Sequence, residues 1–140
     1  MTNLFIVENK IGAIKEYLGI LKGFKKFSYF QLADDVFIRG SVERYLYLAA
    51  QSAIDLAESV IALKDYRKPT TLKEGFEILE EEGVISIELR NAMRDMAGFR
   101  NIIAHDYAKI DYSKVYDIVQ NRLPDVEKFS TQIKKYLNLR

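Results

Sequence analysis

Apolar residues recur at helical spacing through most of this chain, and few helix-breaking residues interrupt them. In the first stretch they stand three or four positions apart, at Leu4, Val7, Ile11, Ile14, Leu18 and Leu21. Such spacing forms one apolar stripe along a helix that packs against other helices. The 140 residues include only seven glycines and two prolines, which favours long helices joined by short turns.

Five helices are predicted from this spacing and from residues typical of helix ends. They cover roughly residues 4–21, 32–63, 71–83, 86–100 and 111–137. Gly23 should end the first of them, and residues 24–31 should connect it to the second. Gly40 weakens the prediction for the early part of the second helix.

Residues that begin helices precede the last three predicted segments. Thr71 and Glu74 match a capping box, and Ser86 and Asp111 are suitable N-cap residues. Pro124 lies inside the last segment and should bend it. No strand pattern and no internal repeat is visible. The sequence therefore predicts an all-α fold, an up-and-down bundle of four to five helices.

Length and composition exclude several classes of protein. At 140 residues the chain fits a single domain spanning residues 1–140. It has no cysteine, which excludes disulfides and thiolate metal sites. Its formal net charge of +1 lacks the basic excess of proteins that coat nucleic acid, so any RNA contact would be local. Without a signal peptide or a long apolar run, we expect a cytoplasmic protein with no membrane partner.

The only histidine, His105, lies in a segment rich in functional side chains, Arg100-Asn101-Ile102-Ile103-Ala104-His105-Asp106-Tyr107. In a straight helix, Arg100 and His105 would point about 140° apart, because they are five residues from each other. Asn101 and His105, four residues apart, would share a face. If the helix frays near Ala104, His105 can swing back toward Arg100, so the hypothesis requires a pocket at this helix end.

Arginine and histidine together suit cleavage of RNA by its own 2′-hydroxyl. Arginine offers a permanent charge and a forked donor for phosphate, and histidine exchanges protons near neutral pH. The reaction needs a base, a cation beside the phosphorane and an acid for the departing 5′-oxygen, but no metal. One histidine cannot easily be both base and acid. A homodimer would supply a second copy of His105; Tyr107 or a water molecule is the alternative.

The spacing of Arg100, His105 and Tyr107 resembles the signature of HepT-like HEPN toxins, which is Arg, four residues, His, one residue, Tyr. The surrounding sequence also resembles this family over nearly the whole chain. The matching segments are Gly98-Phe99, Ile110-Asp111, Val115-Tyr116, Glu43-Arg44 and Gly83-Val84-Ile85. The resemblance implies a helical homodimer with Arg and His in a cleft at the subunit interface. It also implies a metal-independent endoribonuclease without a cofactor.

The family resemblance further implies a role for each motif residue. Arg100 would bind the scissile phosphate and His105 would be the acid–base group, while Asn101 would orient the phosphate or the imidazole ring. An MNT-type nucleotidyltransferase antitoxin would neutralise the toxin by transferring AMP to Tyr107. The added bulk and negative charge would block and repel RNA.

Polar residues on the second predicted helix are weaker candidates. Arg44, Gln51, Asp55 and Glu58 follow helical spacing, which suits either a solvated face or the wall of a cleft opposite His105. Asp55 would hold Arg100 or Arg44 in place. Two other interpretations of the chain stay open: a HEPN module that binds RNA or nucleotide, or dimerises, without catalysis, and an Arg100 segment that only fastens the end of its helix.

Overall fold

The computed structural model describes residues 2–140, and the side chains from Leu4 onward. These residues form seven α-helices, one short 3₁₀ turn and one π-helical segment, and no strand. In chain order they are α1 (Thr2–Lys22), α2 (Tyr29–Asp34), α3 (Val36–Lys64), α4 (Glu74–Glu81), α5 (Ile87–His105), η1 (Tyr107–Lys109), α6 (Tyr112–Asp117), η2 (Ile118–Arg122) and α7 (Leu123–Tyr136). The predicted all-α fold is confirmed.

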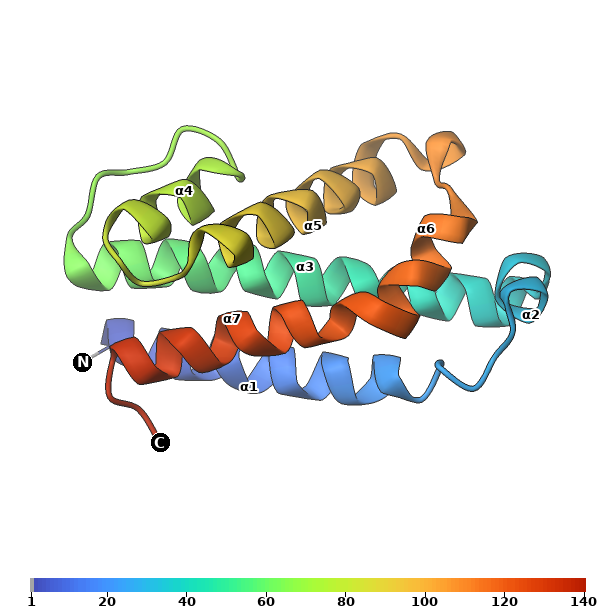
Figure 1. Cartoon of the computed structure of the whole chain (residues 1–140), viewed down its shortest axis with the longest axis horizontal. Coiled ribbons are helices and arrows are strands. Elements are labelled where there is room, and N and C mark those ends of the chain that lie inside the picture. Colours follow the sequence, from blue (N-terminus) through green and yellow to red (C-terminus); the bar gives the residue numbers. More distant parts are fainter. Residues whose placement is uncertain (1) are drawn as a thin grey trace.

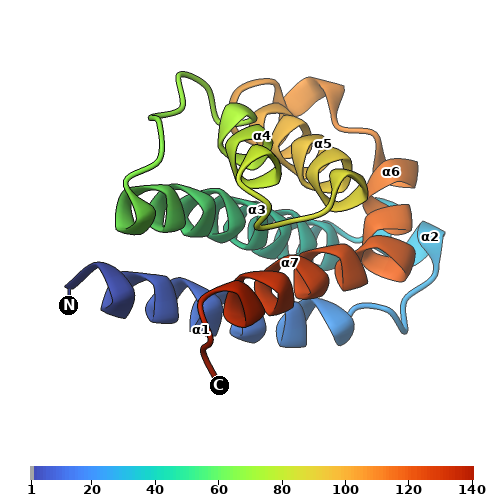
Figure 2. The ribbon, with the colours of Figure 1, turned by 60° about the vertical axis from the view of Figure 1, so that its left-hand side comes forward.

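The long helices α1, α3, α5 and α7 run alternately in opposite directions and form the bundle (Figure 1). The short helix α4 lies beside α5 over one end of α3, as a second view of the ribbon shows (Figure 2). Helices α2 and α6 close the opposite end (Figure 1). The last turn of α5 therefore lies near the first half of α3, at the end of the bundle that α2 and α6 close.

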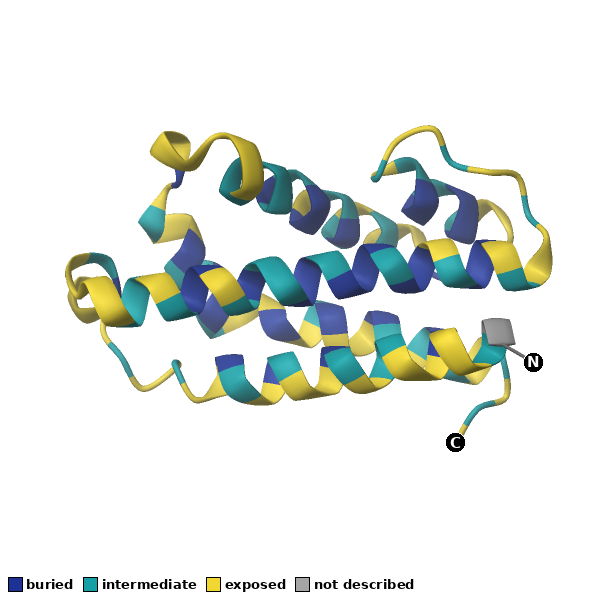
Figure 3. Ribbon diagram, turned by 180° about the vertical axis from the view of Figure 1, so that it is seen from behind, coloured by how far each residue is buried: buried dark blue, intermediate teal, exposed yellow. Residues whose placement is uncertain are grey.

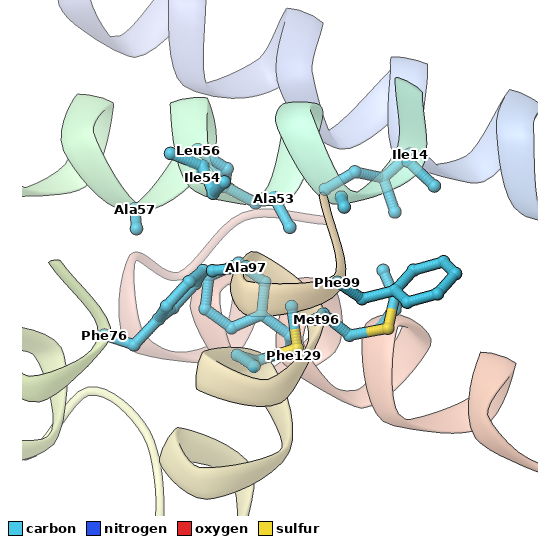
Figure 4. Close-up of a cluster of buried hydrophobic side chains, with 14 of the residues drawn as sticks. Ile14, Ala53, Ile54, Leu56, Ala57, Phe76, Met96, Ala97, Phe99 and Phe129 are labelled. Atoms are coloured by element: carbon cyan, nitrogen blue, oxygen red, sulfur yellow. The ribbon is translucent and has the colours of Figure 1, made fainter. Parts of the chain in front are cut away.

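The core lies between α3 and the helices around it, and apolar side chains fill it (Figure 4). Phe76 and Phe129 meet edge to face, with their ring centroids 5.4 Å apart. Small residues on α3, Ala53 and Ala57, are also fully buried and allow neighbouring helices to approach closely. This core holds α3 and α5 in fixed positions, and both helices carry candidate site residues.

Among the described helices, α3 alone is long and apolar enough, by length and composition, to cross a membrane. Yet 56% of its most apolar stretch is buried inside the bundle. Buried and exposed positions alternate along α3 (Figure 3), as they do in the core helix of a folded protein.

The second helix was predicted over residues 32–63 as one element, and this prediction is wrong at its beginning. The chain leaves the helical conformation at Asp35, between α2 and α3 (φ −86°, ψ 114°). The Asp35 carboxylate accepts hydrogen bonds from the backbone N–H groups of Phe37 and Ile38, at 2.9 and 3.1 Å. Asp35 is thus an N-cap residue rather than a helix-interior residue. Gly40 lies within α3 without interrupting it.

The predicted connection over residues 24–31 also contains the beginning of a helix. Ser28 and Gln31 form a capping box, in which each side chain accepts a hydrogen bond from the other residue's backbone N–H. The box predicted at Thr71 and Glu74 forms only in part. Thr71 accepts from the Glu74 backbone N–H at 3.1 Å, but the Glu74 carboxylate binds Thr70 and Arg67 instead.

The predicted helix boundaries at Gly83 and Asp111 are confirmed, whereas α5 continues past the predicted end at Arg100 to His105. Gly83 follows α4 with a φ of 76°, a conformation that favours glycine. Asp111 caps α6 by accepting from the Ser113 backbone N–H at 2.9 Å. The wide turns of η2 lie just before Pro124, whose ring clashes with the carbonyl four residues earlier in a regular helix. As predicted, the direction of the chain changes there, between α6 and α7 (Figure 1).

Ser86 caps α5, the helix that carries the motif, by accepting from the Leu89 backbone N–H at 3.2 Å. We expect Ser86→Ala to lower the free energy of unfolding by about 1 kcal/mol, because an N–H at the helix start loses its partner. Urea unfolding monitored by circular dichroism measures this loss. Ser130→Ala in α7, which removes no cap, is the control and should change stability by less than about 0.5 kcal/mol. Equal effects of the two substitutions would contradict the assignment.

Candidate active site

An open groove of about 630 Å³ lies where the first half of α3 faces the end of α5 and the η1 turn. Its lining residues are Gly40, Glu43, Arg44, Tyr47, Arg100, Ile103, Ala104, His105 and Tyr107. Four predicted site residues thus border one groove: Arg44, Arg100, His105 and Tyr107. The groove is more open than a buried ligand pocket and suits a polymer that passes along the surface.

Although a groove does lie at its end, as the hypothesis requires, helix α5 does not fray near Ala104. It continues to His105 and ends at Asp106, whose backbone N–H donates to the Ile102 carbonyl at 2.9 Å. Even so, both Arg100 and His105 line the groove. The long arginine side chain extends across to α3, while the exposed imidazole stands on the last turn of α5. The length of the Arg100 side chain therefore brings the guanidinium to the same groove as His105 without any fraying of the helix.

The Arg100 guanidinium is held by a hydrogen bond from each of its three nitrogens. Nε donates to Gln51 Oε1 at 2.7 Å, Nη1 to Asn101 Oδ1 at 3.0 Å and Nη2 to the Tyr47 hydroxyl at 3.2 Å. A guanidinium has five N–H bonds, so these contacts leave donors for another acceptor. The group is fixed in place but retains donors that can bind a phosphate oxygen.

Two guanidinium groups lie near the ring of Tyr47. The Arg100 Cζ is 5.1 Å and the Arg44 Cζ 5.8 Å from the ring centroid. A cation at such a distance is attracted by the negative face of an aromatic ring. Arg44 is exposed and lines the groove. The pair of arginines makes the groove locally basic although the whole chain is almost neutral.

Asn101 and Asp55 are not among the residues that line the groove. Asn101 holds Arg100, as described above. Asp55 makes no direct contact with Arg100 or Arg44 that the structure records: its carboxylate accepts from the Gln51 side-chain amide at 2.9 Å and pairs with Lys10 at 3.3 Å. Gln51 is therefore the link between Asp55 and Arg100. The structure therefore does not show Asp55 holding either arginine, as was predicted; Asp55 contacts Gln51, and Gln51 binds Arg100.

Three residues of the site were not singled out from the sequence: Glu43, Tyr47 and Gln51. Gln51 was seen only as part of a polar stripe. A signal existed, since the three residues are spaced four apart on α3 and thus share one face with each other. Their partners are 49 to 69 residues away in sequence, so the contacts themselves could not be seen there.

Two tyrosines interact with the buried carboxylate of Glu43. Tyr112 donates its hydroxyl hydrogen to Glu43 Oε1 at 2.9 Å. Burial, followed by this hydrogen bond, raises the pKa of Tyr112 above its ordinary value. Hydrogen bonding to Glu43 likewise raises the pKa of Tyr107, which is 56% exposed at the groove. The Tyr107 hydroxyl is therefore a neutral phenol at physiological pH.

Comparison with known proteins gives matches over nearly the whole chain. The family described as "Ribonuclease HepT-like" matches residues 14–133. The mRNA nuclease HepT of Shewanella oneidensis is 29% identical over 130 residues, covering 92% of this chain and 96% of the relative. The tRNA nuclease HepT of Aphanizomenon flos-aquae is 29% identical over 139 residues, covering 98% and 95%.

The fold is also that of a solved toxin. The tri-AMPylated HEPN toxin of Shewanella oneidensis, in complex with an MNT antitoxin, superposes with a TM-score of 0.86 at 28% identity, over 93% of this chain and 97% of that one. Sequence and structure agree with the family resemblance of residues 100–107. The chain belongs to the ribonuclease HepT-like family, and the expected class of enzyme, an endoribonuclease, is confirmed at the level of that family.

Proposed function

We propose that this chain is a metal-independent endoribonuclease toxin that cleaves RNA in the groove between α3 and α5. One observation supports this most: Arg100, held by three hydrogen bonds, and the exposed His105 line the same groove. Arg100 supplies the fixed cation and His105 the proton carrier. Arg44, also at the groove, adds a second positive charge for the RNA backbone.

The proposed reaction begins when a base removes the proton of the 2′-hydroxyl. The 2′-oxygen attacks the adjacent phosphorus, the bond to the 5′-oxygen breaks, and an acid protonates that oxygen. The free N–H groups of Arg100 stabilise the negative charge that develops on the phosphorane oxygens. Because Gln51, Asn101 and Tyr47 already fix the guanidinium, little reorganisation is needed when this charge develops.

A homodimer would complete this site. The chain has one histidine, whereas in-line cleavage uses a base and an acid on opposite sides of the phosphorus. A two-fold axis beside the groove would bring a second His105 to the other side. Large apolar side chains at the start of α3 are exposed near the groove, Val36 at 60% and Phe37 at 85%, and burying them would favour such an association. Sedimentation equilibrium measures the stoichiometry.

An MNT-type nucleotidyltransferase antitoxin is the proposed protein partner, and Tyr107 is its proposed site of AMP transfer. Tyr107 fits this role because it is exposed and lines the same groove as Arg100 and His105. An AMP group there would place a negative phosphodiester against the two arginines and occupy the path of the RNA. Toxin, antitoxin and RNA would meet in the cytoplasm.

RNA cleavage in the presence of a chelator tests the proposed activity. We expect the purified, unmodified protein to cut RNA at the same rate with and without EDTA, because Arg100 and His105 supply the charge and the protons. Gel electrophoresis of a labelled RNA measures the cut fraction, and the same strand made of DNA is the control, since it lacks the attacking 2′-hydroxyl. Binding without cleavage would instead favour a non-catalytic RNA-binding module, and cleavage of the DNA strand would contradict the mechanism.

A further inference from the structure

Two hydrogen bonds in sequence lead from Arg100 at the groove to Asp55, which does not line the groove. Arg100 Nε donates to Gln51 Oε1 at 2.7 Å, and Gln51 Nε2 donates to Asp55 Oδ1 at 2.9 Å. Gln51 and Asp55 are half-buried and stand four residues apart on α3, so they share one face of this helix. The cleavage reaction proposed above uses Arg100 but assigns no role to Asp55.

The two charged partners of Gln51 determine the direction in which its amide points. A guanidinium only donates hydrogen bonds and an ionised carboxylate only accepts them, whereas an amide does both. Arg100 therefore requires the amide oxygen of Gln51, and Asp55 requires its amide nitrogen. Reversing the amide would bring N–H groups together at one end and oxygens together at the other. Gln51 is thus anchored at both ends in a single orientation.

Two further charged residues lie beside the Asp55 carboxylate. Its second oxygen pairs with Lys10 of α1 at 3.3 Å, and because these side chains are 35% and 32% exposed, the pair adds little to stability. Glu58 follows three residues later on α3, and burial, followed by repulsion from Asp55, raises the pKa of Glu58. Lys10 and Glu58 therefore offer controls for the ion pair and for the negative charge, separate from the hydrogen bond to Gln51.

We propose that Asp55 is a positioning residue for Arg100, which it holds through the Gln51 amide. Without the Asp55 acceptor, the amide keeps only one anchor, and the guanidinium is less well fixed at the groove. A small displacement of a group that stabilises developing charge lowers the rate of reaction. This inference rests on the proposed role of Arg100 in RNA cleavage, and it adds to that role a residue outside the lining of the groove.

Hydrogen exchange of the Arg100 Nε–H tests this positioning without RNA. In a nitrogen–proton correlation spectrum, the arginine signal that Arg100→Lys removes belongs to this group. We expect Asp55→Ala to speed its exchange with water by about three- to tenfold, because the hydrogen bond to Gln51 opens more often. An unchanged exchange rate would overturn the proposal, whether or not the protein cuts RNA.

Glu58→Gln is the matched control for the exchange measurement. It removes a negative charge from the same face of α3 but leaves the bond between Asp55 and Gln51 in place. The exchange rate of the Arg100 Nε–H should therefore stay as it is in the unaltered protein. Equal acceleration by Glu58→Gln and Asp55→Ala would show an effect of charge alone and would contradict the proposal.

Cleavage kinetics of single and double variants test whether Asp55 acts through Gln51. Asp55→Ala should lower kcat by about three- to tenfold with little change in KM, because the charge that Arg100 stabilises develops in the transition state. In a Gln51→Leu background the link is already broken, so Asp55→Ala should cause no further loss. The same fold loss in both backgrounds would exclude a route through Gln51.

Two more substitutions separate the hydrogen bond from the pair with Lys10. Asp55→Asn keeps an oxygen that can accept from the Gln51 amide, so exchange should stay slow and most of kcat should remain. Exchange about threefold faster or more in this variant would overturn the proposal even if Asp55→Ala does not fold. Lys10→Met removes only the ion pair and should leave the Arg100 exchange rate unchanged; acceleration equal to that of Asp55→Ala would assign the effect to the ion pair instead. If none of these proteins cuts RNA, the proposed ribonuclease fails, but the exchange rates still decide whether Asp55 positions Arg100.

Discussion

Replacing His105 by alanine should lower the rate of RNA cleavage by a factor of about 10² to 10⁴, the range that a positioned acid or base contributes. The imidazole is the only one in the chain, so no other histidine can replace it. Because His105 is exposed on the last turn of α5, its removal should leave the fold unchanged. Initial rates on a labelled RNA and a circular dichroism melt measure the two effects.

Asp106 offers a matched control for this variant. It is the next residue, is also exposed, and pairs with Lys109 at 3.3 Å within the same turn of chain. Asp106→Ala should therefore alter cleavage far less than His105→Ala. Cleavage that persists in the His105 variant would remove this residue from the mechanism, and comparable losses in both variants would point to a disturbed helix end instead.

Replacing Arg100 by lysine should lower cleavage by about 10² to 10³, although the positive charge is kept. Lysine has no planar fork and cannot bond to Gln51, Asn101 and Tyr47 while also presenting donors to a phosphate. The loss should occur in kcat rather than in KM, because the charge develops in the transition state. Steady-state kinetics measure both constants.

Two further variants separate orientation from stability. Arg44, unlike Arg100, is not held by such a set of hydrogen bonds. Arg44→Lys should therefore mainly weaken RNA binding and leave kcat nearly unchanged. Gln51→Leu leaves Arg100 in place without one of its acceptors and should cost about tenfold in kcat. If Arg100 only fastens the end of α5, Arg100→Lys would instead lower the melting temperature and leave kcat unchanged. That result would overturn its proposed role.

The fold was predictable from the sequence because apolar spacing and helix-end residues act locally. Gly83, Ser86 and Asp111 mark helix boundaries where the structure has them. The error over residues 32–63 has the same local origin. Asp35 is a strong N-cap residue, but its neighbours are compatible with a helix. The continuous apolar pattern therefore predicted one helix through this position.

The site was predictable only in part, because its residues are joined by contacts over long sequence distances. Motif residues Arg100, His105 and Tyr107 are close in sequence and could be recognised together. Gln51 and Tyr47 bond to Arg100 across 49 and 53 residues, which no periodicity reveals. Fraying near Ala104 is not needed for a shared groove, because the long arginine side chain reaches the groove from a helix that continues to His105.

Nuclear magnetic resonance of the single imidazole tests the central claim most directly. Without a tag, the protein has one histidine, so its ring Cε1–H signal belongs to His105 alone. A strand in which hydrogen replaces every 2′-hydroxyl that could attack should bind but cannot be cut. We predict that this strand shifts the His105 signal in a saturable manner, and that Arg100→Lys requires a higher concentration for the same shift. An unmoved signal at saturating RNA would place the RNA elsewhere and contradict the account.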